Sequence, residues 1–129
     1  MDKLFNKYQG HLIENAGSHK SEDFIKFAQY AKSRMKEAAE KKNIKLISFY
    51  IGHYDISGFF QSIETGKYAY FSFDNCRYTP LDFTAPNSKG FLLRIAESPE
   101  DYMGGHNHFT DLKGFIPLLE KLVIQGDFI

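Results

Sequence analysis

The sequence predicts an α+β fold, in which an antiparallel four-stranded sheet packs against two N-terminal helices and one C-terminal helix. Two observations lead to this prediction. Apolar residues recur at helical spacing up to residue 43, and from Ile44 onwards the period changes from 3.6 to 2. The first three β-rich stretches are joined by short connections, which favour hairpins and therefore a meander, to which a fourth strand is added.

The two N-terminal helices are predicted at residues 2–15 and from residue 22 onwards. In the first, Leu4, Phe5, Tyr8 and Leu12 are three or four positions apart. In the second, Ser21 is a suitable N-cap. Its apolar stripe consists of Phe24, Phe27, Ala28, Ala31, Met35 and Ala38. Charges of both signs occupy the opposite side, which predicts a solvated face, with a partner-binding face as the alternative.

Four strands are predicted, at residues 44–51, 54–63, 67–74 and 91–96. The third strand has aromatic residues on both faces. Residues 75–90 contain two prolines and form an irregular loop in this prediction. Thr110 is a suitable N-cap for the last helix, but Pro117 predicts either a kink or a helix that begins near Phe115.

Composition indicates one domain over the 129 residues, with a helical part at 1–43 followed by the sheet and last helix at 44–129. Aromatic residues make up 16% of the chain, which suits a core and also a contact surface. The net charge of zero argues against a general nucleic-acid binder. The single cysteine suits a reducing compartment, and no signal peptide or apolar membrane span is recognisable. We therefore expect a cytoplasmic protein with no membrane partner.

The most distinctive stretch is residues 101–111, DYMGGHNHFTD. Gly104 and Gly105 allow a sharp turn and close approach of a ligand to the backbone, and Thr110 would open a helix whose N–H groups could bind an anion. Asn107 is a further candidate binding residue. The alternative is a tight connection between strand and helix, in which Asn107 and His108 cap backbone groups. The sequence favours this structural interpretation.

Histidines and carboxylates suggest a second kind of site. His106 and His108 are two positions apart and point the same way in an extended chain. A third ligand could come from His53, Asp55 or Asp101, and three such ligands would suit a catalytic divalent metal. Surface or capping histidines are the favoured alternative, so no metal or other cofactor is predicted.

A third candidate site lies on the third strand. Residues 67–73, KYAYFSF, resemble the aromatic strand of RNA-recognition motifs, in which exposed rings stack on bases. This resemblance would make Tyr68 and Tyr70 a platform, with Arg77 and Arg94 as basic neighbours. Tyr68 stands where that family has glycine, and the order of elements differs. An ordinary half-buried strand is therefore favoured.

Residues 92–96, LLRIA, followed by DYMGGHN at 101–107, resemble a pattern found in small uncharacterised proteins of bacteriophages and mobile elements. The pattern, LLRxA followed by DYxGGxN, is often accompanied by an upstream hairpin like that at residues 66–72. The resemblance covers roughly residues 52–122. It implies a phage-type accessory protein that acts on a host or defence component.

These observations favour a non-catalytic protein that binds and modulates, or inhibits, a host or defence macromolecule, with a host protein as its partner. One alternative is a small metal- or phosphate-dependent hydrolase or nuclease that uses His53, Asp55 and the residues of the 101–108 loop. The other is a nucleic-acid-binding module. The pattern does not predict an oligomeric state.

Overall fold

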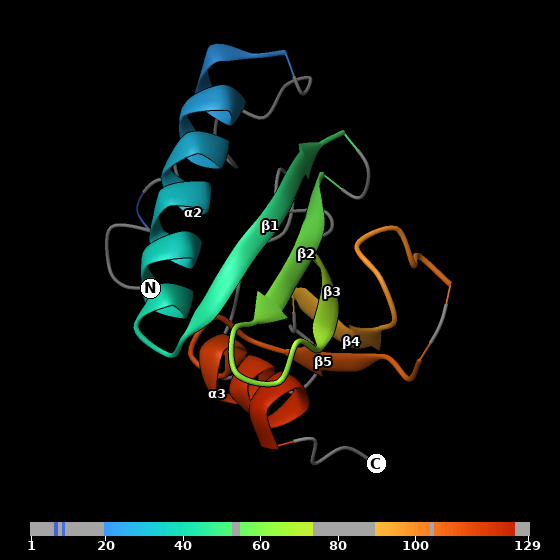
Figure 1. Cartoon of the computed structure of the whole chain (residues 1–129). Coiled ribbons are helices and arrows are strands. Elements are labelled where there is room, and N and C mark those ends of the chain that lie inside the picture. The colour runs from blue at the N-terminus through green and yellow to red at the C-terminus, as the bar shows by residue number, and fades with distance from the viewer. Residues whose placement is uncertain are drawn as a thin grey trace.

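A computed structural model describes residues 7, 9, 20–52, 55–73, 90–103 and 105–125. Eight elements lie in these ranges: α2 (Glu22–Glu40), β1 (Ile44–Ile51), β2 (Ile56–Ser62), β3 (Tyr68–Phe73), β4 (Phe91–Ala96), β5 (His108–Thr110), α3 (Phe115–Glu120) and the π-helix η1 (Lys121–Gln125). Figure 1 shows their arrangement. The predicted α+β class is confirmed.

Helix α2 begins as the sequence predicts. The Ser21 hydroxyl accepts a hydrogen bond from the Phe24 amide at 3.2 Å, which satisfies one of the free N–H groups of the first turn. The predicted apolar stripe is buried, except that Ala39 rather than Ala38 is the last buried residue. Ala39 follows Met35 by four positions and therefore lies on the same face.

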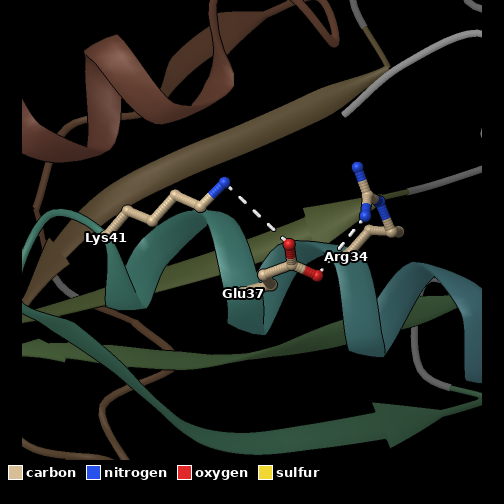
Figure 2. A network of polar contacts seen from close by, with 3 residues as sticks. All are labelled: Arg34, Glu37 and Lys41. Carbon is tan, nitrogen blue, oxygen red and sulfur yellow. Dashed lines mark hydrogen bonds and ion pairs between the residues drawn. The ribbon is translucent and has the colours of Figure 1, made fainter.

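The outer side of α2 carries charges of both signs. The Glu37 carboxylate lies between Arg34, at 3.3 Å, and Lys41, at 3.9 Å (Figure 2). Lys26 and Glu22 form a further pair, at 3.1 Å. Such exposed pairs stabilise a helix by only about 0.3–0.5 kcal/mol each. Their mixed signs agree with a solvated face and do not form a basic surface.

The sheet has five strands rather than the four that the sequence predicts. Their order is β1-β2-β3-β4-β5, and every neighbouring pair is antiparallel. The additional strand, β5, lies within the stretch predicted to be a loop. Three residues are too few to show a strand period, and pairing with the buried strand β4 determines their conformation.

Strand β1 contains a bulge between Leu46 and Ser48. Gly58 of β2 lies directly beneath it: a Cβ atom at Gly58 would come within 2.0 Å of the Ser48 carbonyl oxygen. Only glycine allows this approach, so the bulge and Gly58 depend on each other.

Helices α2, α3 and η1 cover one face of the sheet, and the main core lies between them and the strands. Its centre is aromatic: the Phe91 ring lies 4.3 Å from Phe73 and 4.7 Å from Phe115, measured between ring centroids. Turn β2–β3 is joined to this layer by the Thr65 hydroxyl, which donates a hydrogen bond to the Val123 carbonyl of η1. The opposite face of the sheet therefore carries no described helix.

The described ranges contain two α-helices rather than the predicted three. The first predicted helix, at 2–15, lies outside the described residues except for Lys7 and Gln9, which are helical. The predicted start of the last helix near Phe115 is confirmed, but the proposed N-cap, Thr110, is wrong because this residue belongs to β5.

The turn between β5 and α3 is stabilised by the side chain of Asp111. The Asp111 carboxylate accepts a hydrogen bond from the Gly114 amide at 2.8 Å, which shapes the turn that precedes the helix. Pro117 is the third helical residue, where the missing N–H group has no partner within the helix in any case. Among the described residues, no helix is both long enough and apolar enough to cross a membrane.

Candidate functional site

The face of the sheet opposite the helices carries the candidate site. Strand pairing aligns its side chains in two rows: Tyr50, Ser57, Ser72, Leu92 and Phe109 in the first, and Ser48, Phe59, Tyr70 and Arg94 in the second. Phe59 and Tyr70 are buried although they lie on this face. Residues 97–103 and 105–107, which we call the β4–β5 loop, lie on the side of the sheet away from α2 (Figure 1). They bring Tyr102 onto these two rings.

Arg94 connects strand β4 to the loop. Its Nη2 donates a hydrogen bond to the Tyr102 carbonyl at 2.6 Å, and its Nη1 donates to the Asn107 Oδ1 at 3.3 Å. The guanidinium carbon also lies 4.7 Å from the centroid of the Tyr70 ring, a cation–π distance. One side chain of the sheet thus holds the loop at two points.

Asp101 and Gly105 determine the shape of the loop. The two carboxylate oxygens of Asp101 accept hydrogen bonds from the amides of Glu97 and Met103, at 3.0 and 3.2 Å. Gly105 has a φ of +80°, and a Cβ atom there would lie 2.6 Å from the Ile95 carbonyl oxygen. The loop therefore approaches β4 as closely as the backbone permits.

Tyr102 covers the rings beneath it. Its ring centroid lies 5.2 Å from that of Phe59 and 5.7 Å from that of Tyr70, in both cases with edge-to-face geometry. Its hydroxyl forms a hydrogen bond with Tyr50 of β1. Burial, followed by this hydrogen bond and the nearby Tyr50, Tyr70 and Glu100, raises the pKa of Tyr102. The hydroxyl is therefore protonated at neutral pH.

Apolar side chains face the solvent around Tyr102. Met103 is 91% exposed, and Tyr50 and Tyr102 are 44% and 39% exposed. Tyr50 and Tyr102 touch through their hydroxyls, and Met103 follows Tyr102 in the chain. We call these three residues the Met103 patch. It combines exposed apolar area with a loop held by several internal contacts.

The predicted histidine site is only partly described. His106 is exposed, and His108 is half-buried in β5, paired with Leu93. Asp101 uses both carboxylate oxygens for backbone amides. Within the described ranges, no three His, Cys, Asp or Glu residues are grouped so that they could hold a metal ion. His53 lies outside the described residues.

Asp55, the other candidate in the β1–β2 turn, is buried and has a left-handed φ of +61°. Its carbonyl accepts a hydrogen bond from the Gly52 amide, which closes the turn, and it forms a bridge with Phe73. The structure thus gives Asp55 a role in the hairpin.

Tyr70 does not form an open platform in this structure. It is 3% exposed, Arg94 lies over its ring, and Phe59 and Tyr102 contact its edges. Tyr68 is half-buried, and Arg77 lies outside the described residues. A base could reach the Tyr70 ring only after Arg94 and Tyr102 had moved.

The glycine-rich stretch connects two strands instead of a strand and a helix. Gly104 lies outside the described residues. Asn107, which the sequence suggested as a backbone cap, accepts a hydrogen bond from Arg94 instead. His108 is a strand residue, and the next helix begins only at Phe115. The helix start that would have bound an anion beside the glycines is therefore absent from the described part of this stretch.

Sequence reasoning missed Tyr50, Tyr102 and Met103. Local patterns do not show which face of a sheet a loop covers, because that depends on contacts distant in the chain. One pattern pointed in the right direction: Arg94 is the only charged residue in strand β4, which is otherwise apolar. A charge at an alternating position of such a strand needs polar partners nearby, and the loop provides them.

No family model matches this chain, and neither the curated proteins nor the solved structures contain a significant match. The resemblance to phage and mobile-element proteins therefore stays a prediction.

Proposed function

We propose that the protein is a non-catalytic binding protein that contacts a host or defence macromolecule and modulates or inhibits it. The Met103 patch is the observation that carries the proposal. Large apolar side chains on a surface mark contact sites when they lie together. Aromatic residues and methionine are also enriched in protein–protein interfaces. Here Tyr102 and Met103 lie on a loop that is held by internal contacts, and Tyr50 lies on the neighbouring strand β1.

The polar groups around the patch support the same function. The Arg94 guanidinium, the Asp101 carboxylate and the Asn107 amide oxygen all form contacts within the protein. Each stabilises the loop, so these groups serve to hold its shape. The loop exposes the polar side chains of Glu97, Glu100 and His106. Its exposed apolar groups are the thioether of Met103 and the ring of Tyr102. Such groups suit contact with another surface better than they suit acid–base chemistry.

The kind of partner follows from the sequence resemblance. The stretches LLRIA and DYMGGHN correspond in the structure to β4 and the loop that Arg94 holds against it. The stretches on which the predicted resemblance to phage and mobile-element proteins rests are thus those that support the patch. We infer a host or defence protein as the partner.

The test has two stages. Tagged protein is purified from the host cells, and the co-purifying protein is then produced separately and mixed with the pure protein. We expect a complex of fixed stoichiometry, measured by light scattering and calorimetry. The proposal is wrong if no pure component forms a complex. It is also wrong if the pure protein hydrolyses nucleic acid or nucleotides and His106→Ala or His108→Ala abolishes the activity.

A further inference from the structure

We infer that Met103 is a preformed anchor that enters an apolar pocket with a basic rim on the partner protein. The inference rests on the proposed function and names the recognition element and the chemistry of the surface that it fits. Three properties of the β4–β5 loop support it: its described residues are held by internal contacts, its Met103 side chain is exposed, and it carries the exposed acidic side chains of Glu97 and Glu100.

Contacts within the protein hold the described residues of the loop before a partner binds. Asp101 orders both the start of the loop and the Met103 amide, Arg94 holds the Tyr102 carbonyl, and the Tyr102 ring packs on Phe59. Ordering a flexible loop on binding weakens affinity, and a loop ordered beforehand avoids this cost. Met103 is therefore displayed on a support that internal contacts hold in place.

Met103 itself has the properties of an anchor. Its side chain is 91% exposed, whereas the neighbouring Tyr102 is held by Phe59, Tyr70 and Tyr50. An unbranched thioether adapts to the outline of an apolar pocket. Side chains that become fully buried in such a pocket dominate binding energies, and the surrounding residues keep water out. Tyr102, which precedes Met103 in the chain, is itself partly exposed.

The charged residues of the loop indicate which charge the rim of the partner's pocket should carry. Glu97 and Glu100 are exposed on the same loop, and neither forms an ion pair with another described residue. Arg94, the nearest described cation along β4, is occupied by Tyr102, Asn107 and Tyr70. The described residues of the loop therefore carry more acidic than basic side chains, and the exposed Lys67 borders the loop at Glu97, because its neighbour Tyr68 pairs with Ala96. A partner with lysine or arginine around its pocket complements the acidic side chains of the loop and is attracted during association.

The test uses the pure complex from the experiment above. Met103→Ala is expected to weaken binding at least about tenfold, and Met103→Glu to weaken it further, because a charge cannot enter an apolar pocket. Ile63→Ala is the matched control. Ile63 is also a large exposed apolar residue, at 69%, but it lies on the turn that Thr65 joins to η1. This control is expected to bind as the unchanged protein does.

The charge is tested with the double variant Glu97→Gln and Glu100→Gln. It is expected to associate about two- to tenfold more slowly at low salt and to lose part of the salt dependence of association. Circular dichroism confirms that each variant is folded. Faster association of the double variant would contradict a basic rim.

The support of the loop is tested without a partner, by amide hydrogen exchange. The Glu97 and Met103 amides are expected to be protected in the free protein, and Asp101→Ala is expected to remove this protection. Unprotected amides in the unchanged protein would overturn the preformed loop. If Met103→Ala binds as tightly as Ile63→Ala, the anchor is wrong while the proposed function stands. If no complex forms at all, both are wrong.

Discussion

Replacing Gly105 with alanine tests how closely the β4–β5 loop packs on strand β4. Gly105 has a φ of +80°, and the new Cβ atom would lie 2.6 Å from the Ile95 carbonyl oxygen and 2.9 Å from the Arg94 Cγ. Gly66 is a matched control, since its φ is +74° but a Cβ atom there would meet nothing within 4 Å. The two substitutions share the backbone penalty and differ in the overlap.

The expected losses of stability follow from these distances. A left-handed conformation costs a residue other than glycine about 1–2 kcal/mol, and alanine recovers about 0.4–1 kcal/mol by restricting the unfolded chain. Gly66→Ala should therefore cost about 1 kcal/mol. At Gly105 the overlap adds the cost of overpacking, about 1–3 kcal/mol, because a backbone oxygen must move. We expect Gly105→Ala to cost about 2–4 kcal/mol in total.

Urea unfolding followed by far-ultraviolet circular dichroism measures both free energies. The two free energies are compared only if both variants show the same slope of unfolding free energy against urea concentration. A changed slope would indicate a changed denatured state. A loss at Gly105 no larger than that at Gly66 would refute the close approach. The positive φ would then be the one remaining reason for a glycine at position 105.

Three further changes test other parts of the structure. Gly58→Ala places a Cβ atom 2.0 Å from the Ser48 carbonyl oxygen and should cost more than about 3 kcal/mol in the same urea experiment; unchanged stability would contradict the bulge geometry. Thr65→Val leaves the Val123 carbonyl without its hydroxyl partner and should cost about 1–2 kcal/mol, whereas Thr65→Ser, the control, should retain most of the stability. Because the pKa of Tyr102 is raised above 10.0, its contribution to stability is complete below pH 10.0 and is lost as the pH rises through the raised pKa. Between about pH 9 and about pH 11, the free energy of unfolding measured with urea should therefore fall further in the unchanged protein than in Tyr102→Phe. Equal decreases would refute the raised pKa of Tyr102.

The sheet illustrates what local patterns can predict. All four predicted strands are present, because each is long enough to show a strand pattern: β1 and β4 have the predicted bounds, whereas β2 and β3 begin two residues and one residue later than predicted. Strand β5 is too short for this. Thr110 has the chemistry of an N-cap, but its pairing with Phe91 places it in the sheet, and the observed N-cap, Gly114, lies four residues further along the chain. Tertiary pairing overrode a local preference.

The candidate site shows the same limit more strongly. Arg94 and Tyr70 were both predicted as binding residues, on the assumption that they face a ligand. In the structure they contact each other, because β3 and β4 pair in a register that places them side by side. Their burial further depends on Tyr102, eight positions after Arg94. Its side-chain placement could not be derived from spacing, since a loop of that length can turn to either face.

The order of the strands has a consequence for synthesis on the ribosome. Each strand pairs with its neighbour in the chain, so the sheet can assemble hairpin by hairpin as the nascent polypeptide emerges. The ring of Phe115, which contacts Phe60, Phe71 and Phe91, arrives only afterwards. Until then part of the apolar face of the meander is uncovered. Packing of the segment from Phe115 to Val123 therefore covers the apolar surface that the partly folded chain still exposes. A chain whose synthesis stalls before this segment would keep that surface exposed and would be a substrate for chaperones.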